Sequence, residues 1–295
     1  MWPERVEGPG VTHFATALAA GPVLLDGGLA TQLEAQGANL STALWSAQLL
    51  VDDPDAVVAA HAAFFAAGAQ VATTASYQAP LALIPASVRL AQQARDQCAA
   101  GHDRWVAGSV GPYGAFRADG SEYRGDYGLS VSELRAWHRP RIAALVEAGA
   151  DVLGCETIPS LAEAEALLLE VAGVGVPCWL SLTCAGDRTR AGEPAYAGFA
   201  MARDVIEVVA VGVNCVDPGD VPGLLALATA ASGKPGVAYP NRGERWDSEL
   251  RAWTGPDHFT PAEAIAWVEA GARLVGGCCR VGPADIAAMR AALLN

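Results

Sequence analysis

The chain has 295 residues, of which 52% are hydrophobic and 17% are charged, so it can bury a large core and is not a disordered protein. Its formal net charge of −13 argues against nucleic acid as a partner. The sequence has no basic N-terminal segment followed by an apolar run and no apolar stretch long enough to span a membrane. It contains seven cysteines, an odd number. We therefore expect a cytoplasmic protein with reduced thiols and no membrane partner.

Segments typical of strands and helices alternate along the chain. Buried strands are predicted at residues 22–26, 70–73, 105–109, 151–154, 178–183, 208–213, 236–239 and 273–277. Helices are predicted at 53–67, 85–99, 130–149, 160–171 and 260–271, and we expect Pro140 to kink or break the third. A long polar, glycine-rich loop spans 111–128, and the segment between Tyr196 and Val208 is short for a helix.

Capping patterns support several of these helix starts. Asp53 stands before Pro54, which suits the first helical position. Two capping boxes are predicted, one from Ser130 with Glu133 and one from Ser160 with Glu163, and Thr260-Pro261 with Glu263 is predicted to cap the last helix.

The number of strands favours one architecture. Length alone allows either two domains or one barrel. Eight alternating strands favour a single-domain α/β protein, a (β/α)8 TIM barrel over residues 1–295, with an open doubly wound sheet as the alternative. Similar Ala-Gly-Ala segments, which close helices and enter strands at Gly68, Gly149 and Gly271, support the barrel, although alanine-rich helices also end in glycine by composition alone.

In such a barrel, the residues that follow the strands gather at one face, where the active site lies. On this chain they are Asp26, Tyr77, Ser109, Glu156, Thr157, Asn214, Cys215, Asn241, Cys278 and Cys279.

Three cysteines converge on this face. Cys278 and Cys279 follow Gly276 and Gly277, which allow a sharp turn and a close approach. Adjacent cysteines could form a vicinal disulfide, bury as small apolar residues, or ligate a soft metal. With Cys215 on the same face, they provide the three thiolates and one open place of a catalytic zinc. The other cysteines are expected to be core or bystander thiols: Cys98, Cys155, Cys178 and Cys184.

Two carboxylates face the same mouth. Asp26 and Glu156 could capture an α-ammonium group or act as a general acid/base pair. Asp26 could also simply form a turn, and Glu156 could simply favour a helix N-terminus. The backbone N–H groups of Gly27 and Gly28 could hold a carboxylate.

The chain resembles the homocysteine S-methyltransferases, and most closely the branch that uses S-methylmethionine. The resemblance spans nearly the whole chain and is carried by segments at 26–31, 73–79, 108–114, 118–127, 155–159, 212–215, 240–247 and 277–280. It implies a (β/α)8 barrel, Zn²⁺ held by Cys215, Cys278 and Cys279, and methyl transfer to the zinc-bound thiolate of homocysteine, giving methionine. It also implies that Asp26 and Glu156 bind the amino group of homocysteine. Val281-Gly282 stands where hydroxyl residues are expected.

We expect the substrate-binding residues to be Asp26, Gly27, Gly28, Tyr77, Glu156, Thr157 and Asn214. The donor would be a sulfonium cation, which aromatic faces attract. The candidate aromatic residues are Tyr77, Tyr113, Tyr123, Tyr127 and Trp246. The alternatives are a methyltransferase for selenocysteine or another thiol, a zinc hydrolase, and a non-enzymatic zinc or redox switch.

Overall fold

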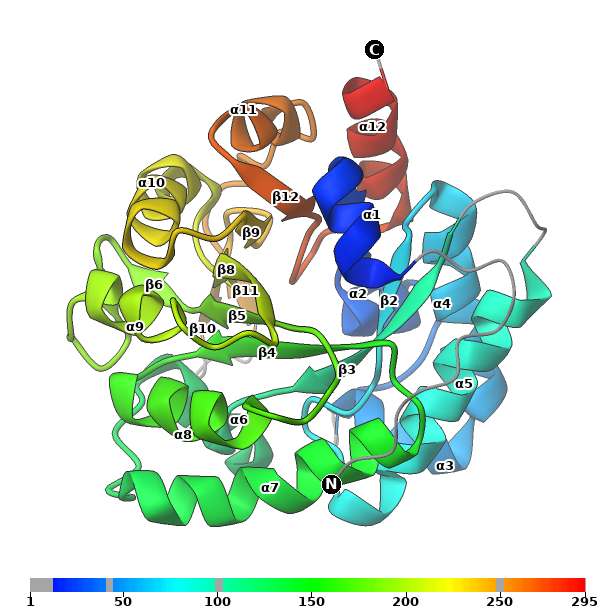
Figure 1. Ribbon diagram of the computed structural model, residues 1–295. Helices are drawn as coiled ribbons and strands as arrows, with labels where there is room; N and C mark the ends of the chain where they lie inside the picture. Colours follow the sequence, from blue (N-terminus) through cyan, green and yellow to red (C-terminus); the bar gives the residue numbers. More distant parts are fainter. Residues whose placement is uncertain (1–12, 41–44, 99–102, 248–251, 295) are drawn as a thin grey trace.

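Eight parallel strands form one sheet that curves into a nearly closed barrel in the computed structural model (Figure 1). The structure describes residues 13–40, 45–98, 103–247 and 252–294. The sheet order is β1-β12-β9-β8-β5-β4-β3-β2. The bounds are β1 (Val23–Leu24), β2 (Val71–Thr73), β3 (Trp105–Val110), β4 (Val152–Ile158), β5 (Cys178–Leu182), β8 (Val208–Asn214), β9 (Gly236–Tyr239) and β12 (Ala272–Val275).

A backbone bond and a side-chain bond connect the two end strands of this sheet. The Gln70 N–H donates to the Leu24 carbonyl at 2.7 Å, and the Gln70 side-chain oxygen accepts from the Leu24 N–H at 3.2 Å. The predicted single-domain (β/α)8 barrel is therefore confirmed, and an open doubly wound sheet is excluded.

Helices surround the barrel (Figure 1). They are α1 (Phe14–Ala20), α2 (Leu29–Ala35), α3 (Leu49–Asp52), α4 (Pro54–Ala67), α5 (Ile84–Gln97), α6 (Tyr113–Arg117), α7 (Val131–Glu147), α8 (Leu161–Val171), α9 (Ala195–Met201), α10 (Val221–Ser232), α11 (Glu263–Glu269) and α12 (Pro283–Leu294). The 3-10 turns are η1 (Trp45–Gln48), η2 (Leu81–Leu83), η3 (Ser121–Tyr123) and η4 (Pro218–Asp220). Two hairpins pair β6 (Cys184–Ala185) with β7 (Arg188–Thr189) and β10 (Arg245–Asp247) with β11 (Ala252–Thr254).

Large side chains fill the barrel interior. Trp105 and Trp179 are almost fully buried there, in one cluster with Phe14 and Leu18 of α1. The Phe14 and Trp105 rings meet edge to face at 5.4 Å. Gly154 makes room for Trp179, because a Cβ at position 154 would lie 2.5 Å from the indole ring. A filled interior means that substrates reach the protein at the carboxyl ends of the strands and do not pass through a pore.

Two of the predicted caps form as expected, and one forms only in part. Asp53 accepts from the Ala56 N–H at 3.1 Å, and Ser130 with Glu133 makes a complete capping box. Ser160 accepts from the Glu163 N–H, but the Glu163 side chain turns inward. That carboxylate accepts from the Tyr113 N–H at 2.6 Å and lies 2.8 Å from His138 Nε2, so it anchors the loop after β3 and does not complete a capping box.

α7 continues through Pro140, so the predicted break does not occur. Side chains on both sides of the proline are buried, among them Leu134 and Leu145, and the helix packs against α5, α8 and β3. The last predicted helix is shorter than expected and begins at Glu263 after a turn at 261–262, so Thr260 does not cap it as predicted and Ala262 takes the N-cap position. The predicted end of α5 at Ala99 lies outside the described residues.

Several elements were not predicted. They are the helices α1, α2, α3, α6, α10 and α12 and the two small hairpins. α9, which contains Tyr196, is short, as predicted for this segment, and β5 still pairs with β8 in parallel over five residue pairs. No helix in the described part of the chain combines the length and apolarity needed to cross a membrane.

Candidate functional site

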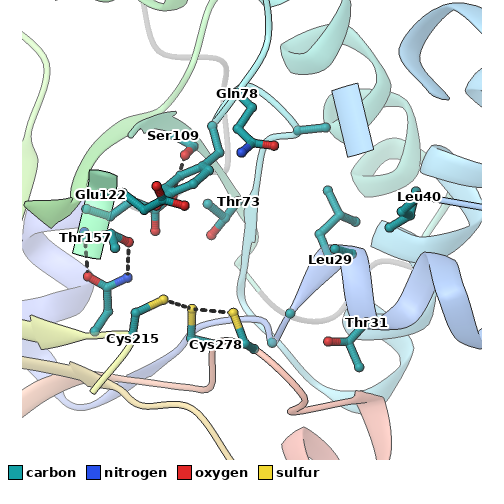
Figure 2. Close-up of a pocket in the computed structure, with 18 of the residues that line it drawn as sticks. Leu29, Thr31, Leu40, Thr73, Gln78, Ser109, Glu122, Thr157, Cys215 and Cys278 are labelled. Atoms are coloured by element: carbon teal, nitrogen blue, oxygen red, sulfur yellow. Dashed lines mark hydrogen bonds between the residues drawn. The ribbon is translucent and has the colours of Figure 1, made fainter. Parts of the chain in front are cut away.

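Three cysteine sulfurs meet at the carboxyl ends of two strands. Cys215 follows β8, and Cys278 and Cys279 follow β12. Sγ of Cys215 lies 2.6 Å from Sγ of Cys278, which lies 3.9 Å from Sγ of Cys279 (Figure 2). Hydrogen bonding from Cys278 lowers the pKa of the Cys215 thiol, whereas hydrogen bonding with Cys215 raises the pKa of the Cys278 thiol. The convergence predicted for these three cysteines is therefore confirmed.

Glycines allow the Cys278 segment to approach β1. A Cβ on Gly276 would lie 2.6 Å from Cβ of Leu25, and one on Gly277 would lie 2.2 Å from the Val281 side chain. Val281 stands where the family pattern led us to expect a hydroxyl residue. Its side chain is fully buried and lies beside Gly277, next to the two cysteines. Asn241 holds the far cysteine, since its Oδ1 accepts from the Cys279 N–H at 3.2 Å.

The sulfur cluster fits a metal ion with one open coordination place. In the part of the chain that the structure describes, the group of potential ligands at this point consists of Cys215, Cys278 and Cys279, whose sulfurs all lie within 4.8 Å of one another. Three soft sulfur donors without a fourth protein ligand are typical of catalytic zinc, whereas structural zinc has four protein ligands.

Strained backbone surrounds the first cysteine. Cys215 has φ 50° and Thr157 has φ 60°, a region that β-branched residues rarely adopt. The buried Asn214 side chain stabilises this conformation, because it accepts from the Thr157 N–H and donates to the Thr157 hydroxyl, both at 2.7 Å. Such strain persists where the surroundings fix the backbone, as they commonly do at functional sites.

A bulge in β4 carries two of the predicted site residues. β4 pairs with β5 at Cys155 and again at Ile158, with a shift of register between them. Glu156 and Thr157 lie in this shift, so they belong to the strand and do not follow it as predicted. Cys155 likewise lies within the strand, where it is buried.

Asp26 is buried with both oxygens turned toward Thr73. Its Oδ2 accepts from the Thr73 N–H at 2.7 Å, and its Oδ1 accepts from the Thr73 hydroxyl at 2.9 Å. Burial nevertheless raises the pKa of Asp26 to about 7, because desolvation outweighs these bonds. A cationic ligand beside Asp26 would compensate for this desolvation.

Glu156 lies in a hydrogen-bonded network of the barrel mouth. The Ser109 hydroxyl donates to its Oε1, and the Tyr239 hydroxyl donates to its Oε2 at 3.1 Å. Tyr239 in turn accepts from Trp179 Nε1 at 2.9 Å, so the network reaches into the barrel core. Burial first, and then the negative charge of Cys215, raise the pKa of Glu156 to about 8.

The sulfurs and both carboxylates line one cavity of about 1110 Å³. Thr157, Cys215 and Cys278 lie on one side of it, and Leu29, Thr31 and Leu40 lie on the other (Figure 2). The remaining predicted substrate-binding residues also line it: Gly27, Gly28, Tyr77 and Asn214. The Gly28 N–H, however, donates to the Val281 carbonyl at 2.9 Å, so the prediction that it holds a carboxylate is wrong for this conformation.

The candidate aromatic residues separate into two groups. Tyr77 and Tyr123 line the cavity. Tyr113 and Tyr127 instead pack against each other at 5.4 Å, and Tyr113 also contacts Trp137, so these two rings anchor the loop. The side chain of Trp246 lies outside the described residues.

Sequence reasoning missed several polar residues of the cavity, among them Tyr239 and Glu122. Tyr239 ends the predicted strand at 236–239. The alternation of strands and helices does not reveal that the Tyr239 hydroxyl reaches Glu156. Glu122 belongs to a loop segment that was used only as a family motif, although a carboxylate beside tyrosines facing a candidate metal centre was a usable signal. The four remaining cysteines lie outside the sulfur cluster, as predicted.

Comparison with known proteins agrees with this site. The homocysteine S-methyltransferase family profile matches residues 23–293. A curated homocysteine S-methyltransferase of Escherichia coli is 43% identical over 294 residues, covering 91% of this chain and 94% of the relative. A selenocysteine Se-methyltransferase of Brassica oleracea var. italica is 37% identical and covers 93% and 90%.

A solved structure is equally similar. The metallated form of the E. coli homocysteine methyltransferase MmuM superposes with a TM-score of 0.81 at 42% identity, covering 92% of this chain and 96% of that one. Because the profile spans almost the whole chain and the relatives match over nine tenths of their length, this protein belongs to the homocysteine S-methyltransferase family.

Proposed function

We propose that this homocysteine S-methyltransferase moves a methyl group from S-methylmethionine to homocysteine with the help of a zinc ion bound by Cys215, Cys278 and Cys279. The observation that carries the proposal is the meeting of three sulfurs beside two buried carboxylates in one cavity. Family membership supplies the class of reaction, and the site chemistry supports the metal and the donor.

The three cysteines would hold the metal as thiolates. When bound there, zinc would offer its open place to the acceptor sulfur and favour the thiolate form of that sulfur at neutral pH. The surrounding residues fix the sulfurs before the substrate arrives. The Thr183 hydroxyl donates to the Cys215 carbonyl at 3.2 Å, and Asn241 holds Cys279.

Asp26 and Glu156 would bind the α-ammonium group of homocysteine. Both are buried beside the sulfurs, and desolvation raises the pKa of each, so a cation that enters between them relieves an electrostatic cost of the empty site. The network through Tyr239 and Ser109 fixes Glu156 in place. We predicted that the backbone N–H groups of Gly27 and Gly28 bind the substrate carboxylate. Because the Gly28 N–H already donates to Val281, we now propose this role for Gly27 alone.

The donor would lie against Tyr77 and Tyr123. Their rings line the cavity, and the faces of such rings attract compact cations such as a sulfonium. The transfer breaks the S–CH₃ bond of the donor, whose electron pair leaves on a neutral sulfide, and forms the new bond to the acceptor thiolate. Alignment of the two sulfurs with the methyl carbon is then the main task of the cavity.

Other acceptors and roles are less well supported. Selenocysteine offers the same chemistry, and a relative bears that activity in its name. A barrel-type zinc hydrolase would usually use histidine or carboxylate ligands, which the sulfur cluster lacks among the described residues. A redox switch leaves the two buried carboxylates without a role. A cytoplasmic location and a part in methionine biosynthesis stay predictions.

Removing any one of the three cysteines should remove the metal. We expect about one zinc per chain in the purified protein, and Cys215→Ala, Cys278→Ala and Cys279→Ala should each lower zinc content and abolish methionine formation, because two sulfurs hold the ion poorly. Metal analysis and activity assays measure both. Cys98→Ala is the control, since this thiol lies on α5 outside the cluster. A Cys215→Ala protein with full zinc and full rate would rule the centre out.

Neutral replacements of the two carboxylates should weaken homocysteine binding. Asp26→Asn and Glu156→Gln each remove a charge-assisted contact worth roughly 1.5–3 kcal/mol, so calorimetric titration should show about tenfold weaker binding or more, with zinc content unchanged. Unchanged homocysteine titrations in both variants would contradict the assignment.

The thermal stability of Asp26→Asn separates lost binding from lost folding. Burial raises the pKa of Asp26 above its unfolded value, so the charged side chain lowers the free energy of unfolding as the pH rises through about 7. At pH 8 the neutral variant should therefore have an equal or higher Tm. A lower Tm would mean that the variant is damaged.

The donor preference follows from the resemblance of residues 118–127 to the S-methylmethionine-using branch. With homocysteine as acceptor and donors at equal concentration, S-methylmethionine should give a higher kcat/KM than betaine, methyl-folates or S-adenosylmethionine, because it is a compact sulfonium that the faces of Tyr77 and Tyr123 attract, whereas S-adenosylmethionine needs room for its adenosyl group. Methionine formation is the readout. If betaine gave the higher kcat/KM, the donor assignment would be wrong and the metal centre would still stand.

A further inference from the structure

A third carboxylate, Glu122, faces the cavity and has no role in the reaction described so far. It lines the cavity in η3, on the same side as Thr157 and Cys215 (Figure 2). Its Oε2 is buried, yet it has no hydrogen-bond partner among the described residues. A buried carboxylate oxygen without a partner is costly, and such groups are uncommon in folded proteins.

The loop is built so that this side chain points inward. Asp119 accepts from the Ser121 N–H at 3.0 Å, and the Gly125 N–H closes the turn on the Ser121 carbonyl at 2.8 Å. Gly114 lets the loop fold back closely, because a Cβ there would lie 2.4 Å from the Glu122 nitrogen. The Tyr113 N–H bond to Glu163 anchors the start of the loop. Glu122 is thus held at the cavity by the fold of its loop, with one carboxylate oxygen shielded from solvent.

The nearby cations are paired elsewhere. Arg117 bonds to Asp119 at 3.0 Å, and Arg124 bonds to Asp126 at 3.3 Å. Burial raises the pKa of Glu122 to about 7, and the negative charges of Asp119 and Cys215 act in the same direction. Arg124 lowers the pKa of Glu122, but less than these raising effects, and among the described residues no ion pair joins the Glu122 side chain to a positive group.

Glu122 and the pair Asp26–Glu156 make two separate acidic positions. Asp26 is among the charges that raise the pKa of Glu156, and Asp119 is among those that raise the pKa of Glu122, whereas Cys215 acts on both. Glu122 also acts on the pKa of Tyr77 together with Tyr123, so it shares the side of the cavity assigned to the donor. Two acidic positions match two cationic substrates.

We propose that Glu122 is the specificity-determining counter-charge for the sulfonium of the methyl donor. The inference rests on the proposed function, since it takes the donor to be a sulfonium amino acid. Glu122 exchanges no proton in the transfer; it offers the cation a carboxylate beside the rings of Tyr77 and Tyr123. Because the sulfonium loses its charge as the methyl leaves, this contact stabilises the bound donor more than the transition state. Its removal should thus raise KM for the donor without lowering kcat.

Glu122→Gln tests the proposal, with Glu34→Gln as the matched control. Glu34 is an exposed carboxylate that lines the same cavity. At saturating homocysteine, Glu122→Gln should raise KM for S-methylmethionine about tenfold or more and leave kcat equal or higher, since a charge-assisted contact to the ground state is lost. Glu34→Gln should change neither constant. Glu122→Asp, which keeps the charge, should have a lower KM than Glu122→Gln.

Homocysteine titration and zinc content give readouts that do not depend on turnover, and both should be unchanged in Glu122→Gln. A homocysteine affinity that falls with the variant would place Glu122 at the acceptor and overturn the proposal. An unchanged KM for S-methylmethionine would overturn it too, while leaving the proposed function intact. If the wild-type protein forms no methionine from S-methylmethionine, the proposed donor is wrong, and the role of Glu122 falls with it.

Discussion

The site depends on one constraint: the cysteines that follow two different strands, β8 and β12, must bring their sulfurs close enough to bind a single ion. Cys215 and Cys278 are 63 positions apart in the sequence, yet their sulfurs are in contact because β8 and β12 flank β9 in a curved parallel sheet. Parallel strands place their carboxyl ends at one face of the barrel. The side chains packed around Trp105 and Trp179 fill the interior behind that face. The glycines before Cys278 and the strained backbone at Cys215 complete the approach.

The second organising feature is an excess of negative charge in a buried space. Asp26, Glu156 and Glu122 share the cavity with three thiols, and burial raises the pKa of each carboxylate. The nearby arginines relieve this charge only in part, since Arg190 lowers the pKa of Cys215 and Arg124 lowers that of Glu122 while burial still raises the pKa of each carboxylate. Arg141 donates to the carbonyls of Ser76 and Ala79, and Arg190 lies 5.9 Å from the Tyr123 ring centroid and bonds to Thr183. A cavity of this kind favours cationic substrates, and both proposed amino-acid substrates carry ammonium groups.

Much of this was predictable from the sequence. The eight strands and the meeting of Cys215 with Cys278 and Cys279 follow from alternation and from the rule that strand ends share a face. Features set by tertiary contacts were not predictable. The bulge that turns Glu156 and Thr157 into the mouth depends on pairing with β5, and α7 tolerates Pro140 because its buried face is packed. The inward turn of Glu163 and the isolation of Glu122 likewise arise from neighbours distant in sequence.

The central claim is that three cysteine sulfurs form a zinc centre whose open place receives the thiol of homocysteine. X-ray absorption at the zinc edge, recorded with and without homocysteine, tests it most directly. We predict three sulfur neighbours at about 2.3 Å for the protein alone and four when homocysteine is added, since zinc–thiolate bonds have that length. A spectrum with only nitrogen and oxygen neighbours, or one that homocysteine leaves unchanged, would contradict this account.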